Sequence, residues 1–204
     1  RRVASINLFY VLISFMSKYK LSPWKILKSE SLLDSRFLKV NKERCELPNG
    51  KVIPDFYTLW QPDWVLVLAK NTEGFWLMER QYRHGTGKVS LEFPAGIVEA
   101  GEIPVDAAKR ELQEECAFGG GSFEFLAELP MNPDRHRGRF FVVGATGVVQ
   151  SGETHFDSSE EIETLQFSTE EVLSKMRSGE ISHPHQIAAF FLYGLKDSFE
   201  ILNK

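Results

Sequence analysis

The chain has 204 residues, which suits one folded domain with a modest additional unit. Hydrophobic residues make up 43% of the sequence and charged residues 25%, the composition of a globular protein with a full core. The formal net charge of −4 gives no general positive field, so we expect no nucleic-acid partner. The two cysteines form no C-x-x-C pair, which excludes the common zinc and redox motifs. Thiols without a disulfide framework are typical of the cytoplasm, where we expect the protein.

The first fifteen residues resemble a signal peptide only superficially. Two arginines precede a short apolar run that ends at Phe15 and contains Asn7. The run is too short for a membrane span, and no small-x-small cleavage site follows it. We therefore expect residues 1–15 to be an expression-derived or upstream extension, with Met16 as the native start and no membrane partner.

The first block, residues 16–60, predicts a small antiparallel sheet. Apolar stretches lie at Trp24–Leu27, Phe37–Val40 and Val52–Leu59. The segment Pro48-Asn49-Gly50 is a strong turn signal between the last two stretches. We expect about three strands in this block.

The second block, residues 61–204, predicts a mixed α/β domain. Alternating apolar segments predict strands at residues 64–69, 75–81, 123–129, 139–149 and 162–167. Helical spacing and start signals predict helices at residues 104–116, 169–178 and 184–196. Residues 91–98 are expected to form an extended loop, and Gly119-Gly120-Gly121 to end the first helix. Strands on both sides of a central helix, followed by terminal helices, indicate an α/β sandwich.

Three carboxylates gather on the predicted helix 104–116. Glu111 and Glu115 are four residues apart and share a face, and Glu114 lies beside them. Like charges at this spacing destabilise a helix, so we expect a cation to offset the repulsion. Mg²⁺ is the natural candidate because hard cations take oxygen ligands. Three glutamates alone would fit a solvated acidic face as well, and only the flanking residues favour the metal site.

The flanking residues match a known pattern. Gly96, Glu102 and the run Arg110-Glu111-Leu112-Gln113-Glu114-Glu115 resemble the Nudix box, G-x5-E-x7-R-E-U-x-E-E-x-G-U. Every charged position matches, while Ala117 replaces the closing glycine. We expect Ala117 to change how the helix exits and to matter little to the chemistry. The resemblance implies a Nudix α/β/α sandwich with a mixed central sheet.

The resemblance also implies roles for residues of the box. Glu111, Glu114 and Glu115 would bind Mg²⁺ or Mn²⁺, together with the backbone carbonyl of Ala95 or Gly96. The pair Glu102 and Arg110 would be structural and orient the helix. Metal ions would stabilise the attacking and leaving oxygens while water attacks phosphorus.

Three further features resemble one subgroup, the ADP-ribose and nucleoside diphosphate sugar pyrophosphatases. The run LEFPAGIVEAGE begins at Leu91 and resembles L-E-x-P-A-G-x-[VI]-x-x-G-E. Pro133 stands fifteen residues beyond the box, as in that subgroup. The first block resembles its domain-swapped N-terminal sheet, which builds a homodimer. The resemblance implies cleavage of substrates such as ADP-ribose or GDP-mannose to a nucleoside monophosphate and a sugar phosphate.

Substrate contacts are expected mainly from arginines, because a guanidinium recognises phosphate through two parallel hydrogen bonds. Arg83 is the favoured candidate, while Arg80 fits a surface role equally well. We expect one arginine of the NPDRHRGR segment to touch substrate; its candidates are Arg135, Arg137 and Arg139. Trp24 is a candidate to stack on the base, although packing at a dimer interface is the more common role.

The catalytic base is expected on the loop before the strand 162–167. The subgroup often has acid-x-acid there, and here Ser158 replaces the first acid while Glu160 keeps the second. Glu160 is favoured as base or as an additional metal ligand, with Glu161 next. Glu115 is the third carboxylate assigned to catalysis.

Two alternative functions remain open. One is a Nudix hydrolase of nucleoside triphosphates, dinucleoside polyphosphates or capped RNA, against which Pro133 and the N-terminal sheet count. The other is a non-catalytic Nudix-like ligand-binding module. Such modules commonly lose box glutamates, and this chain keeps them all.

Overall fold

The computed structural model describes residues 21–156 and 161–202, with side chains up to Leu195 in the last helix. The chain divides into two compact units, Arg1–Leu59 and Trp60–Lys204. The expected extension at residues 1–15 lies outside the described residues.

The first unit is a three-stranded sheet with the order β1-β2-β3. Its strands are β1 (Lys25–Asp34), β2 (Lys39–Glu46) and β3 (Val52–Trp60). β1 pairs with β2 in antiparallel register, and the Leu47 N–H donates to the Lys51 carbonyl where the next hairpin closes. Every residue of β1 is exposed within the single chain.

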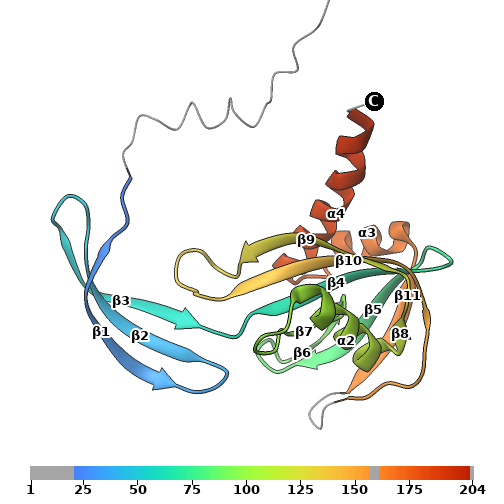
Figure 1. Cartoon of the computed structure of the whole chain (residues 1–204), viewed down its shortest axis with the longest axis horizontal. Coiled ribbons are helices and arrows are strands. Elements are labelled where there is room, and N and C mark those ends of the chain that lie inside the picture. Colours follow the sequence, from blue (N-terminus) through green and yellow to red (C-terminus); the bar gives the residue numbers. More distant parts are fainter. Residues whose placement is uncertain (1–20, 157–160, 203–204) are drawn as a thin grey trace, which may run out of the picture. The chain divides into compact units, whose positions relative to one another are not determined.

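The second unit contains an eight-stranded mixed sheet (Figure 1). Its main path runs β11-β5-β4-β10-β8, while β6, β7 and β9 pair with β5, β4 and β10. The central strands β4 and β10 are parallel, and the other registered pairs are antiparallel. The strands are β4 (Trp64–Asn71), β5 (Trp76–Arg83), β6 (Lys88–Glu92), β7 (Ala95–Ile97), β8 (Phe118–Gly119), β9 (Ser122–Pro130), β10 (Arg139–Gln150) and β11 (Ile162–Phe167).

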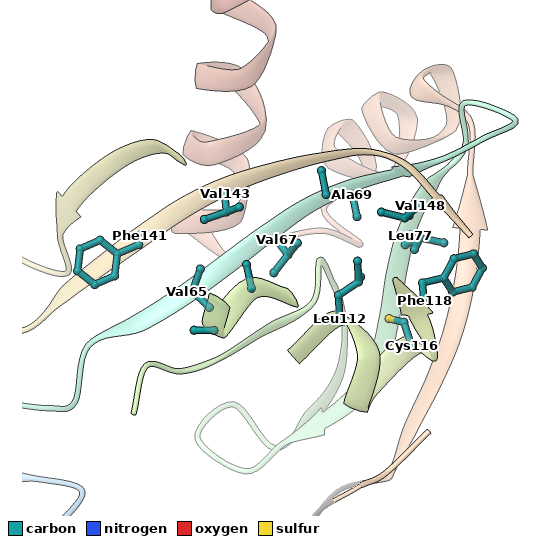
Figure 2. Packing of buried hydrophobic residues seen from close by; sticks show 13 residues of the cluster. Val65, Val67, Ala69, Leu77, Leu112, Cys116, Phe118, Phe141, Val143 and Val148 are labelled. Carbon is teal, nitrogen blue, oxygen red and sulfur yellow. The ribbon is translucent and has the colours of Figure 1, made fainter. Parts of the chain in front are cut away.

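Helices cover both faces of this sheet, which confirms the predicted α/β sandwich. They are α2 (Pro104–Cys116), α3 (Thr169–Ser178) and α4 (Pro184–Leu202). Successive residues of β4 point to opposite faces, as the period of two requires. Val65 and Val67 pack with Leu112 of α2 (Figure 2), while Leu66 and Leu68 join the core beneath α3 and α4. A strand buried on both faces accounts for the continuous apolar sequence of β4.

The helix α2 ends at Cys116, as predicted, but the glycine run does not cap it. Ala117, and not Gly119-Gly120-Gly121, forms the left-handed C-cap, with φ 56° and ψ 34°. The Ala117 N–H donates to the Gln113 carbonyl and so gives that carbonyl of the last helical turn a hydrogen-bond partner. Gly119 already belongs to β8. Ala117 is the one non-glycine with positive φ in the described part of the chain.

The expected loop at residues 91–98 is also wrong in part. Residues 88–92 form β6 and residues 95–97 form β7. β7 pairs with the start of β4, where Gly96 faces Val65 in the register. This pairing satisfies backbone groups that a loop would leave to water.

Both cysteines are buried. Of the helices that the structure describes, none is both long and apolar enough to cross a membrane.

Candidate active site

The buried side of α2 presents two carboxylates to strand β7. The side chains of Glu111 and Glu115 are almost fully buried, with 8% and 4% of each residue exposed. The Glu115 Oε2 accepts a hydrogen bond from the Ala95 N–H at 3.2 Å. A Cβ added at Gly96 would overlap the Glu111 carboxyl group, so a side chain at this position would displace that carboxyl group. The structure therefore brings Ala95, Gly96, Glu111 and Glu115 together.

Arg110 ties the preceding loop to this acidic face. Its guanidinium donates to both oxygens of Glu102, at 3.0 Å each, and to the Ile97 carbonyl at 2.9 Å. It also contacts Glu111 at 2.8 Å and Glu114 at 3.1 Å. The hydrogen bonds from Arg110 lower the pKa of Glu102, and Glu102 in turn raises the pKa of Arg110.

Glu79 is a buried carboxylate that the sequence analysis did not single out. It lies on β5 with 0% of its surface exposed. Neither of its oxygens has a hydrogen-bond partner in the part of the chain that the structure describes. Burial raises the pKa of Glu79 well above its ordinary value, and repulsion from Glu115 adds to this shift. Glu79 lies two residues after Leu77, so both side chains point to the same face of the sheet, and Leu77 belongs to the core beneath α2. This spacing is the sequence signal that could have predicted the position of Glu79.

A second buried polar group surrounds Arg83 at the end of β5. Arg83 donates to both oxygens of Glu92, at 3.2 Å and 2.9 Å, and lies 3.9 Å from Glu79. Burial opposes ionisation of Glu92, but the bonds from Arg83 leave its pKa below the ordinary value. Gln186 from α4 accepts from the Phe93 N–H at 2.5 Å and donates to the Phe93 carbonyl at 3.2 Å. The sequence analysis quoted Glu92 only as part of the run LEFPAGIVEAGE and assigned no role to Glu92 or Gln186.

The donor set suits a hard divalent cation. No three acidic, histidine or cysteine side chains among the described residues are arranged as ready ligands, and Glu111 and Glu114 both contact Arg110. The partnerless oxygens of Glu79 beside Glu115, with the Gly96 backbone against Glu111, nevertheless supply oxygen donors of the kind that Mg²⁺ prefers. The residues present therefore fit such an ion.

The remaining predicted site residues are not among the contacts described above for the α2 carboxylates. Arg80 has the opposite orientation to Glu79 on β5 and pairs with Glu163 at 2.7 Å. Arg139 pairs with Asp63 at 2.6 Å and with Glu128 at 3.2 Å. The substrate-binding roles of Arg80 and Arg139 stay predictions. The same holds for the roles of Arg135, Arg137, Glu161, Glu160 and Trp24. Arg135 and Arg137 lie between β9 and β10, Glu161 is exposed before β11, Glu160 is outside the described residues, and Trp24 belongs to the first unit, edge-on to Phe56.

Two family models match the chain. One is described as the NUDIX domain and matches residues 60–190. The other is described as the nucleoside diphosphate sugar hydrolase N-terminal domain and matches residues 24–59. The two matches meet at the boundary between the two compact units.

Curated relatives match most of the chain at low identity. The ADP compounds hydrolase NudE of Escherichia coli is 25% identical over 87% of this chain and 94% of its own length. The ADP-ribose pyrophosphatase of Bacillus subtilis is 26% identical over 86% and 95%. The methanol dehydrogenase activator of Bacillus methanolicus is 34% identical over 56% of this chain and 61% of its own length.

A crystal structure of an ADP compounds hydrolase has the same fold. It superposes with a TM-score of 0.79 at 22% identity, and the match covers 90% of this chain and 98% of the other.

Proposed function

Because the chain belongs to the Nudix family of pyrophosphohydrolases, we propose that it is a Mg²⁺-dependent hydrolase of nucleoside diphosphate sugars, with ADP-ribose as the first candidate. The observation that carries the proposal is the burial of Glu111 and Glu115 against the Ala95-Gly96 backbone. Burying two carboxylates of one helix is unfavourable unless they are compensated. A divalent cation offers that compensation and matches the chemistry of the family.

Two observations support the substrate class: the match of the N-terminal unit and the names of the relatives that cover most of the chain. Residues 24–59 match the N-terminal domain model of nucleoside diphosphate sugar hydrolases. The relatives that cover most of the chain are named as enzymes of ADP compounds and ADP-ribose. We therefore favour this class over nucleoside triphosphates, dinucleoside polyphosphates and a non-catalytic module.

Each residue of the site has one role in this proposal. Glu111, Glu114 and Glu115 would hold the metal, with the Ala95 or Gly96 carbonyl as a further donor. Bound Mg²⁺ would supply charge stabilisation to the attacking and leaving oxygens. Arg110 would fix the helix face through Glu102, and Arg83 would bind substrate phosphate. The base would come from the loop that contains Glu160 and Glu161.

The proposal includes a homodimer in the cytoplasm, in which residues 16–60 form the dimerisation sheet and residues 61–204 the catalytic domain. The strand β1 supports a protein partner, because every one of its residues is exposed and several of them are large and apolar. Those exposed by more than 40% are Ile26, Leu27, Leu32 and Leu33. Two buried cysteines that form no C-x-x-C pair support a reducing compartment.

A substrate panel tests the proposal. ADP-ribose, GDP-mannose, dGTP and a diadenosine polyphosphate are incubated with the protein and Mg²⁺, and products are separated by chromatography. We expect AMP and ribose phosphate from ADP-ribose at the highest kcat/KM. Glu115→Gln should abolish this turnover with unchanged circular dichroism, while Glu73→Gln in an exposed turn should not. Preference for dGTP, or full activity of Glu115→Gln, would contradict the proposal.

A further inference from the structure

We propose that Glu79 of β5 is a further carboxylate ligand of the cation site, so that the ion is held between the sheet and the helix α2. This inference rests on the proposed function, which draws its carboxylate ligands from α2 alone. It adds a residue from a different element, outside the Nudix box.

The fold brings Glu79 beneath the end of α2. In the sheet, Glu79 lies opposite Thr164 of β11. The Thr164 hydroxyl in turn donates to the backbone carbonyl of Glu115 at 3.3 Å. Glu79 also shares the orientation of Leu77, which packs against Leu112 of α2 in one core cluster. The Glu79 side chain is therefore directed toward the helix face that carries Glu115.

The Glu79 carboxyl group has one long ion pair, with Arg83, and no hydrogen bond among the described residues. It is fully buried, and its two oxygens have no hydrogen-bond partner among the described residues. Buried polar groups are normally hydrogen-bonded, so an orphaned carboxylate indicates an absent partner. The nearest guanidinium, Arg83, is 3.9 Å away and donates both its Nε and Nη2 to Glu92. A cation shared with Glu115 would give the Glu79 carboxylate the partner that it lacks.

The rival explanation is structural. A neutral Glu79 could share a hydrogen bond with Glu115 and merely hold that side chain in place. A glutamine amide donates a hydrogen bond to a carboxylate but is a poor ligand for Mg²⁺. Glutamine at position 79 would therefore preserve the structural role but not the role of metal ligand. The substitution Glu79→Gln therefore separates them.

The experiment measures Mg²⁺ affinity by isothermal titration calorimetry and thermal stability with and without the ion. We expect Glu79→Gln to lower the affinity about tenfold or more. We also expect it to raise the Tm of the metal-free protein, because repulsion from Glu115 is removed. The Mg²⁺-induced rise in Tm should shrink. Glu73→Gln, on the β4–β5 turn of the same hairpin, is the control and should match the wild type in all three.

Glu79→Met provides a second variant of similar length if the glutamine variant folds poorly, and we expect the same loss of affinity. Wild-type affinity in either variant, with Glu115→Gln unable to bind Mg²⁺, would overturn this inference and leave the proposed function standing. A wild-type protein that binds no Mg²⁺ would overturn both.

Discussion

Arg110 and Glu102 are joined by two hydrogen bonds, Nε to Oε1 and Nη2 to Oε2, each 3.0 Å long. The same guanidinium contacts Glu111 and Glu114. One arginine thus fastens the loop before α2 and compensates part of the charge on the acidic face. The pair lies eight residues apart in sequence, so the loop must fold back onto the helix to form it.

The Glu102–Arg110 pair predicts a pH-dependent stability. Arg110 lowers the pKa of Glu102 in the folded protein. A depressed carboxyl pKa stabilises the fold above the unfolded pKa of about 4.3, and this stabilisation is lost as pH falls through the folded pKa. We expect Glu102→Gln to cost roughly 1–2 kcal/mol at neutral pH in urea unfolding with EDTA present. The difference from wild type should shrink near pH 3, and a constant difference would contradict this account.

The left-handed C-cap predicts a stabilising substitution. Alanine at φ 56° costs roughly 1–2 kcal/mol relative to glycine, partly offset by the greater freedom of glycine in the unfolded chain. Ala117→Gly should therefore raise the free energy of unfolding by about 0.5–1 kcal/mol in denaturant titration. Ala108→Gly in the middle of α2 is the control and should lower it by about 1 kcal/mol or more. Equal losses in both variants would show that Ala117 is not strained.

We expect a large loss of stability when the single polar residue Gln186 is replaced by an apolar one. It is 1% exposed and bonds both the N–H and the carbonyl of Phe93. In Gln186→Leu both backbone groups stay buried without partners, at a cost of roughly 2–4 kcal/mol. Urea unfolding measures this cost, and Gln150→Leu on the exposed end of β10 should change stability by less than about 0.5 kcal/mol. Similar small effects in both would remove Gln186 from the account.

We expect substitutions of Arg83 and Arg80 to have different kinetic effects. Arg83 has the same orientation on β5 as Glu79, whereas Arg80 points to the other face and pairs with Glu163. Lysine cannot reproduce the forked guanidinium contact. We expect Arg83→Lys to raise the KM for ADP-ribose about tenfold, equivalent to roughly 1.4 kcal/mol, and Arg80→Lys to change it less than about twofold. Steady-state kinetics compare them, and the reverse order would exchange their assigned roles.

Local signals predicted the helices and strands well. α2 was predicted at its observed bounds, Pro104–Cys116, because Pro104 and Asp106 are start signals within the segment itself. β11 and α3 also have the expected bounds. The mixed sandwich followed from the order of these elements and from the resemblance to the Nudix box.

The features that sequence analysis missed depend on distant partners. β7 exists because residues 95–97 pair with the start of β4, about thirty positions earlier. Gln186 bonds Phe93 across 93 residues, so its importance is invisible in its own helix. Glu79 lies in a strand of ordinary composition, and its significance appears only when Glu115 packs above it. Ala117 was underestimated because the neighbouring glycines are the stronger local signal for a helix end.

The central claim is that the α2 carboxylates hold cations to cleave a diphosphate, and phosphorus NMR of ADP-ribose with the purified protein tests it most directly. With Mg²⁺ present, the diphosphate resonances should give way to two phosphomonoester resonances, those of AMP and ribose phosphate. EDTA should stop the conversion and added Mg²⁺ should restore it. An intact diphosphate in a sample that calorimetry shows to be loaded with Mg²⁺ would contradict the account.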